Sequence, residues 1–159
     1  MMNGKTVPAV VACILLLLAI GVSHAEPRKV QPGDKCQVCG MFVAKYPDWI
    51  AQVVFKDGTY AFFDGPKDMF TYCLNLQKYS PSRSESDIVS TYVTEYYSLK
   101  MIDARKASYV IGSDTYGPMG KELIPFADRQ SAEEFMKDHK GKNVLVFDQV
   151  TPDVLKSLE

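Results

Sequence analysis

The sequence predicts an α+β fold of two ββαβ modules that pack as one domain. Two observations support this prediction. Each half of the chain contains segments rich in β-branched and aromatic residues, then an amphipathic helical pattern, then a further strand-like segment. The order hairpin, helix, strand therefore occurs twice, and two such units can bury their sheets by pairing. We expect the domain to span residues 36–148.

Residues 1–25 have the features of a secretory signal peptide that is cleaved after Ala25. One basic residue, Lys5, precedes an apolar run over residues 7–22, and small residues occupy the two positions that signal peptidase recognises. The alternative is an uncleaved membrane anchor, but a spanning helix needs about 20 apolar residues and this run is shorter. We therefore expect a periplasmic protein whose mature chain does not span a membrane.

Charge and cysteine content narrow the function further. The 159-residue chain has a formal net charge of −1, which gives no reason to expect a nucleic acid or an anionic membrane as partner. Loss of the leader removes Cys13 and leaves Cys36, Cys39 and Cys73. Because an odd number of cysteines leaves at least one thiol without an internal partner, we expect no structural disulfide framework.

The first module is expected to begin with a hairpin. The polar segment 26–35 carries no periodic apolar pattern, and we interpret it as a flexible tether. Two β-forming runs, at residues 49–55 and 59–63, flank Asp57 and Gly58. An Asp-Gly pair between two such runs is a strong signal for a β-hairpin.

A helix should follow this hairpin. Asp64 is a suitable cap, and Pro66 suits the first turn. The buried stripe of this helix is expected to contain Met69, Cys73 and Leu76. On this stripe Cys73 is either a small buried hydrophobic residue or a ligand. A serine-rich loop at residues 79–87 and a strand at 88–94 complete the module.

The second half repeats this order. We expect strands at residues 108–111, 122–126 and 144–147. A glycine-rich loop covers residues 112–120. The intervening helix has a capping box formed by Ser131 and Glu134, and it should end near Gly141. Residues 149–159 form a short C-terminal tail with a helical pattern.

A cluster of sulfur atoms suggests a metal site. The segment CQVCGM at residues 36–41 carries the thiols of Cys36 and Cys39 and the thioether of Met41. Soft sulfur donors favour Cu(I) over harder ions. Gly40 removes a side chain that would crowd them.

Two other interpretations of the cysteine pair stay open. Zinc prefers four ligands in a closed site, so it would need to recruit Cys73 or His139. In thiol–disulfide oxidoreductases a CxxC pair usually opens a helix, and no helical pattern begins at residue 40. The residues alone therefore leave a soft-metal site, a redox pair, and a zinc site or inert pair.

Met119 is the second informative sulfur. Glycines and a proline surround it in the sequence Gly117-Pro118-Met119-Gly120, which predicts a tight loop that presents the thioether. A loop methionine can equally pack as a lid over the core.

Several short motifs, in this order, resemble the NosL family. They are Cys39-Gly40-Met41, Ala51-Gln52-Val53, Phe63-Asp64-Gly65, Pro118-Met119-Gly120 and Ile124-Pro125-Phe126. Each motif is weak alone, but together they cover most of the chain from residue 36 to residue 147. Proteins of this family are exported copper chaperones that assist assembly of the copper centres of nitrous oxide reductase.

The resemblance implies a pair of ββαβ modules and Cu(I) held by Cys39 and Met119, with Met41 and Cys36 as supporting ligands. It implies no catalytic residue. The expected partners are a client copper enzyme, nitrous oxide reductase, and its membrane assembly factors. Many members carry a lipid-anchoring cysteine beside the cleavage site, and Ala25 is followed by none, so we expect no lipid anchor.

Two other functions remain open beside the copper carrier. One is a periplasmic thiol–disulfide oxidoreductase that uses Cys36 and Cys39. The other is an accessory domain with a vestigial site.

Overall fold

A four-stranded antiparallel sheet forms much of the first half of the protein. The structure is a computed structural model that describes residues 25–159, so the predicted signal peptide lies outside the described residues except for Ala25. The strands follow in the order β2 (Tyr60–Phe63), β1 (Ala51–Phe55), β3 (Ile88–Thr94) and β4 (Met101–Asp103). The β1–β2 hairpin is the predicted one, and β4 is additional. Gly58 adopts φ +78° in its turn, a conformation that suits glycine.

Helix α1 (Pro66–Leu74) packs against β1 and β2, and α2 (Leu76–Tyr79) follows it. Met69 of the expected buried stripe is fully buried, as predicted. The expected continuous helix is wrong. Asn75 leaves the helical conformation at φ −125°, so the chain turns before Leu76, and Cys73 is only half-buried.

The second half contains a three-stranded antiparallel sheet. Its order is β8 (Ile124–Phe126), β5 (Ser108–Ile111) and β9 (Asn143–Val146), and helix α3 (Arg129–Asp138) packs against it. In both halves the first strand lies between the strand before the helix and the strand after it. The predicted α+β class is confirmed. The division into two ββαβ modules stays a prediction.

The predicted capping box of α3 is wrong. The helix begins two residues before Ser131, with Asp128 as its N-cap. The Asp128 carboxylate accepts a hydrogen bond from the backbone N–H of Ser131 at 2.8 Å, and Glu134 accepts instead from the side chain of Gln130. An ionised carboxylate is a strong acceptor for free N–H groups at a helix start, and it supplies the cap three positions earlier.

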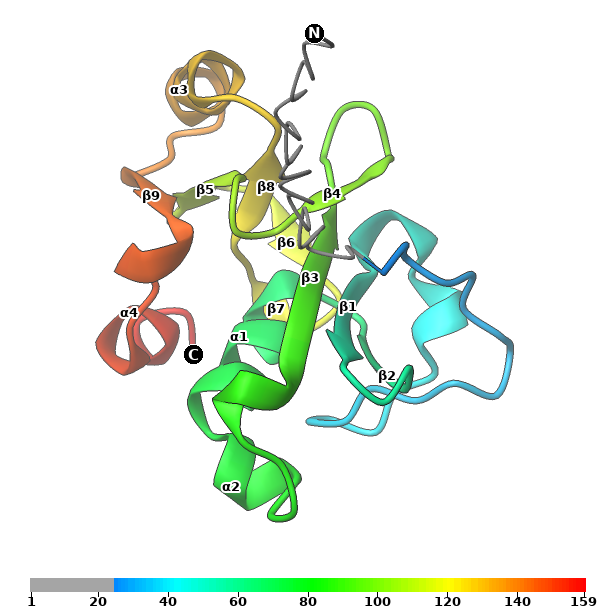
Figure 1. Cartoon of the computed structure of the whole chain (residues 1–159). Helices are drawn as coiled ribbons and strands as arrows, with labels where there is room; N and C mark the ends of the chain where they lie inside the picture. Colours follow the sequence, from blue (N-terminus) through cyan, green and yellow to red (C-terminus); the bar gives the residue numbers. More distant parts are fainter. Residues whose placement is uncertain (1–24) are drawn as a thin grey trace, which may run out of the picture.

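The glycine-rich loop contains a small hairpin, β6 (Tyr116–Gly117) and β7 (Gly120–Lys121), with Met119 in its turn. Helix α4 (Pro152–Lys156) lies beside α1 near the C-terminus (Figure 1). Short 3-10 helices occur at Val43–Lys45, Pro47–Trp49, Glu85–Asp87 and Phe147–Gln149. Among residues 25–159, no helix combines the length and the hydrophobicity needed to cross a membrane.

The segment 26–35, for which we expected a flexible tether, makes hydrogen bonds to the first sheet. The backbone N–H of Arg28 donates to the Gln52 side chain at 2.9 Å, and the amide of Gln52 donates back to the Arg28 carbonyl at 2.7 Å. These paired bonds hold the segment beside β1.

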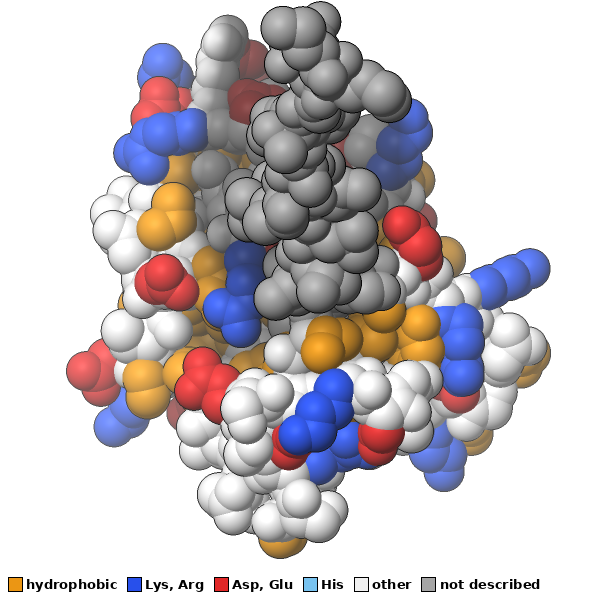
Figure 2. All heavy atoms as spheres, in the orientation of Figure 1, with side chains coloured by type: hydrophobic (Ala, Val, Ile, Leu, Met, Phe, Trp, Pro, Cys, Tyr) orange, Lys and Arg blue, Asp and Glu red, His pale blue; other side chains and the backbone are white. Residues whose placement is uncertain are grey.

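One apolar core joins the two halves. Phe63 and Met69 from the first half pack in the same cluster as Tyr109 and Leu123 from the second. A smaller core lies between α3 and its sheet and contains Val110, Ile124, Phe126, Ala132 and Phe135. The face in Figure 2 shows Lys and Arg side chains interspersed with Asp and Glu side chains, as the small net charge leads one to expect.

The buried carboxylate of Glu122 joins the β6–β7 hairpin to the start of α1. It accepts a hydrogen bond from the backbone N–H of Lys67 at 2.6 Å. The Lys67 ammonium donates to the carbonyl oxygens of Met119 and Lys121, both at 2.8 Å. Gly65 provides the space, because a Cβ at this position would collide with the Glu122 carboxylate. The position of Met119 is thereby tied to α1.

Burial raises the pKa of Glu122 to about 8, against an ordinary value of 4.5. Between these values the unfolded chain releases a proton that the folded protein keeps. The protonated group therefore contributes stability that is complete below pH 4.5 and is lost as the pH rises through about 8. Glu122→Gln keeps the shape and cannot ionise. We expect its melting temperature, relative to the parent, to rise between about pH 4.5 and about pH 8 in calorimetry.

The matched control for this measurement is Glu134→Gln, which changes an exposed side chain on α3. Its difference from the parent should stay constant over the same pH range. If the melting temperature of Glu122→Gln also differs from that of the parent by a constant amount, the carboxyl group of Glu122 does not have the raised pKa described here.

Candidate metal site

Residues 36–41 form a closed loop against β2. The backbone N–H of Cys36 donates to the carbonyl of Met41 at 2.8 Å, and that of Gly40 donates to the carbonyl of Cys36 at 3.0 Å. Gly40 has φ +78°, a conformation that side chains rarely adopt. A bridge between Cys36 and Phe62 attaches the loop to the sheet. Both cysteines are thus held beside the end of β2.

Two aspartates complete a group of four donors. Asp64 follows β2 directly, and Asp68 lies in the first turn of α1. The Cys36 thiol donates to Asp68 Oδ2 at 3.1 Å, and the Cys39 thiol donates to Asp64 Oδ1 at 3.3 Å. One donor atom from each of the four residues lies within 4.8 Å of all the others. We refer to these four residues as the donor cluster.

The expected role of Asp64 as a helix cap is wrong. Gly65 is the N-cap of α1, and the Glu122 carboxylate accepts the N–H of Lys67. The Asp64 side chain faces Cys39 instead, because the closed loop places that thiol beside it. Asp64 Oδ2 is buried and has no hydrogen-bond partner among residues 25–159. A buried carboxylate oxygen without a partner is costly unless a cation or proton compensates it.

Burial controls the protonation of the donor cluster. It raises the pKa of the Cys36 thiol far above its usual range and that of Cys39 to about 11. Burial also raises the pKa of Asp68. Without a metal both thiols therefore keep their protons at neutral pH and donate hydrogen bonds to Asp68 and Asp64.

Met119 lies in a groove beside the donor cluster. The groove has a volume of about 480 Å³, and its lining includes Val38 of the closed loop, Asp68 of α1, and Met119. The Met119 side chain is 45% exposed. Met41 ends the closed loop and is half-buried. The structure thus brings a residue some 80 positions downstream of Cys39 to the same region.

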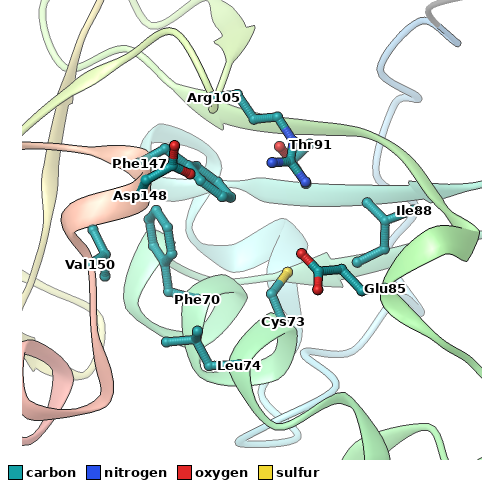
Figure 3. A pocket seen from close by; sticks show the side chains of 10 residues that line it. All are labelled: Phe70, Cys73, Leu74, Glu85, Ile88, Thr91, Arg105, Phe147, Asp148 and Val150. Carbon is teal, nitrogen blue, oxygen red and sulfur yellow. The ribbon is translucent and has the colours of Figure 1, made fainter.

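His139 and Cys73 lie apart from the donor cluster. His139 stacks on Phe135 with ring centroids 4.1 Å apart, and its Nδ1 is 3.1 Å from Asp114 Oδ1. Cys73 lines a cavity of about 330 Å³ with Phe70 and Glu85, and Figure 3 shows its sulfur directed toward the Glu85 carboxylate. Among the residues described, Asp64 and Asp68, and neither Cys73 nor His139, place a possible ligand atom close to both cysteines.

Sequence reasoning missed Asp64 and Asp68 as possible ligands. A signal was present, since two carboxylates four positions apart at a helix start lie on one side of its first turn. Carboxylates are also common at helix starts, because they cap free N–H groups and interact favourably with the helix dipole. The two aspartates therefore did not stand out as metal ligands.

Comparison with known proteins identifies the family. A family model described as NosL matches residues 27–155. The chain belongs to the NosL family. It is 29% identical over 133 residues to the copper-binding lipoprotein NosL of Stutzerimonas stutzeri, which covers 82% of this chain and 69% of that protein. The resemblance inferred from the short motifs is confirmed.

Solved NosL structures are similar as well. The crystal structure of the copper chaperone NosL from Shewanella denitrificans matches with a TM-score of 0.68 and 25% identity, over 80% of this chain and 97% of that one. The solution structure of apo-NosL from Achromobacter cycloclastes is 26% identical, with a TM-score of 0.47, over 66% of this chain and 87% of that one. The match to the Shewanella denitrificans structure shows that the α+β architecture is that of a NosL protein.

The raised pKa of Cys39 predicts a slow thiol. At neutral pH we expect iodoacetamide to modify Cys39 in the folded, metal-free protein at least about tenfold more slowly than in the same protein unfolded in urea. Mass spectrometry of the peptide that contains Cys39 measures both rates. In the folded protein the rate should keep rising toward about pH 11. A rate equal to that of the unfolded chain at neutral pH would contradict this description of the thiol.

Proposed function

We propose that this chain is an exported Cu(I) chaperone, not an enzyme, with Cys39 and Met119 as its main copper ligands. One observation carries the proposal. The groove that Met119 lines also contains Asp68, whose carboxylate accepts a hydrogen bond from the Cys36 thiol. This shared groove supports an approach of the hairpin thioether to the thiols. Thiolates and thioethers are soft donors that favour Cu(I). Cys36 and Met41 are the supporting ligands in this proposal.

The arrangement suits transfer by ligand exchange. Met119 is 45% exposed on a hairpin turn, whereas Cys39 is half-buried in the closed loop. A donor from the client can approach through the open groove and replace Met119 while Cys39 still holds the ion. The first step then needs no free copper ion.

The client that we propose is nitrous oxide reductase, reached in the periplasm after removal of the signal peptide. Membership of the NosL family supports this choice, as does the similarity to a copper chaperone of known structure. A chaperone that holds Cu(I) through soft sulfur ligands can supply copper ions for the assembly of a copper centre.

A thiol–disulfide oxidoreductase is less well supported. Such an enzyme needs an attacking cysteine with a lowered pKa, usually at the start of a helix. Here burial raises the pKa of both Cys36 and Cys39. The first α-helix of the described chain begins at Pro66, far along the sequence from the pair.

Anaerobic Cu(I) titration against a competing chelator tests the proposal. We expect Cys39→Ser to weaken Cu(I) binding by about 100-fold, which corresponds to about 2.7 kcal/mol, because a thiolate is the strongest soft donor available. Met119→Leu removes only the thioether and should weaken binding by about tenfold, or about 1.4 kcal/mol.

Met136→Leu and Cys73→Ser are matched controls, since these sulfurs lie on α3 and in the Figure 3 cavity. Both should bind Cu(I) as the parent does. If Cys39→Ser and Met119→Leu retain the affinity of the parent, the assignment of these ligands fails.

A further inference from the structure

Aromatic side chains surround a cavity that the copper proposal does not use. The cavity has a volume of about 460 Å³, within the range of small-molecule sites. Three separate segments supply its lining, namely the 3-10 helix at Pro47–Trp49, the turn between β3 and β4, and strand β6. The lining includes Asp48, Trp49, Tyr96, Tyr97, Leu99 and Tyr116. We refer to it as the aromatic cavity.

The base of the aromatic cavity is fixed by packing, and its rim is open. Trp49 and Tyr96 are half-buried and pack against the small core between α3 and its sheet. Tyr97 and Tyr116 are 57% and 64% exposed. The Trp49 and Tyr96 ring centroids are 6.4 Å apart with the planes inclined by 59°, and those of Tyr96 and Tyr97 are 5.4 Å apart at 66°. The rings therefore form walls of different orientation instead of a flat stack.

Leu99 at the rim has an unusual backbone conformation. Its φ is +56°, in the left-handed region that leucine rarely adopts, and its side chain is 54% exposed. The turn holds this conformation, because the backbone N–H of Leu99 donates to the Glu95 carbonyl at 2.9 Å and that of Ser98 donates to the Glu95 carboxylate at 2.6 Å. An apolar side chain is thus kept at the mouth of the cavity at a conformational cost, as is common beside ligand sites.

The charge at the aromatic cavity is negative. Asp48 is the charged residue of the lining, and it is exposed. Loss of solvent raises the pKa of the Tyr97 hydroxyl, and the negative charges of Asp138 and Glu134 raise it further. The faces of aromatic rings also carry partial negative charge. Rings and carboxylates therefore favour the same kind of ligand, a cation.

A methylated ammonium group fits this lining better than a lysine or arginine side chain does. Ammonium and guanidinium groups carry several N–H donors that need acceptors, whereas the lining offers mainly aromatic rings and a single carboxylate. A trimethylammonium group has the positive charge without any N–H donor, and aromatic faces are well suited to surround it.

We propose that the aromatic cavity binds a quaternary ammonium group of the choline class, either as a free small molecule or as a lipid headgroup. The four aromatic side chains contact the methyl groups, and Asp48 supplies the opposite charge. The cavity shares no lining residue with the groove beside Met119 and none with the donor cluster. The proposal therefore does not rest on copper binding.

Choline titration followed by tryptophan fluorescence tests the site, because Trp49 is the only tryptophan of the chain. We expect a saturable change with choline, and binding at least about tenfold weaker for its uncharged tert-butyl analogue, in which carbon replaces nitrogen. Equal affinity for the two compounds overturns the proposal, since apolar burial alone would then explain binding. The proton spectrum of choline is a second readout, because methyl protons above aromatic faces shift to higher field. If neither signal changes, the proposal is also overturned.

Tyr116→Leu removes one exposed ring and should weaken choline binding by at least about fivefold. Phe42→Leu is the matched control, since Phe42 is an exposed aromatic residue outside the cavity lining, and it should bind choline as the parent does. Parental affinity in Tyr116→Leu contradicts the proposed site. If circular dichroism shows that this variant is unfolded, Tyr97→Leu takes its place with the same expected loss.

Sedimentation with vesicles distinguishes the two sources of the ligand. For a lipid headgroup, we expect the chain to sediment with phosphatidylcholine vesicles, free choline to release it, and vesicles of phosphatidylethanolamine, which lacks the methyl groups, to bind it more weakly. For a free small molecule, choline binds as described and has no effect on sedimentation with either kind of vesicle.

Discussion

The hydrogen bond from the start of α1 to the buried side chain of Glu122 is the constraint on which the candidate metal site depends. The first turn of α1 carries Asp68, and the hairpin just before Glu122 carries Met119. Lys67 donates its backbone N–H to Glu122, and its ammonium group donates to two carbonyl oxygens of the hairpin. The absence of a side chain at Gly65 allows this approach. Two segments far apart in sequence therefore keep one relative position without a disulfide.

This constraint places donors of different hardness at different depths. The two aspartates and Cys36 are buried, Cys39 is half-buried, and Met119 is the most exposed of the candidate ligands. The soft thioether therefore lies nearest to solvent, and the hard carboxylate oxygens lie deepest.

Local sequence signals predicted much of the fold but only part of the site. The Asp57-Gly58 turn, the apolar stripe of α1 and the strand β3 follow from short-range chemistry that needs no partner. Asp64 illustrates the limit. Its position suggested a cap, and its actual environment depends on a loop closed by Gly40 and on a carboxylate, Glu122, from the other half of the chain. Such long-range contacts leave no periodic pattern in the sequence.

A metal carrier must also be stable when it is empty, and the donor cluster meets this requirement. In a zinc finger the metal supplies the folding energy, and the metal-free chain unfolds. Here the core shared by both halves is built from residues such as Phe63, Met69 and Tyr109, and none of these is a candidate ligand. The thiols of Cys36 and Cys39 each donate a hydrogen bond to one carboxylate oxygen of the donor cluster, on Asp68 and Asp64 respectively. The packing that supports the candidate site therefore does not depend on a bound ion.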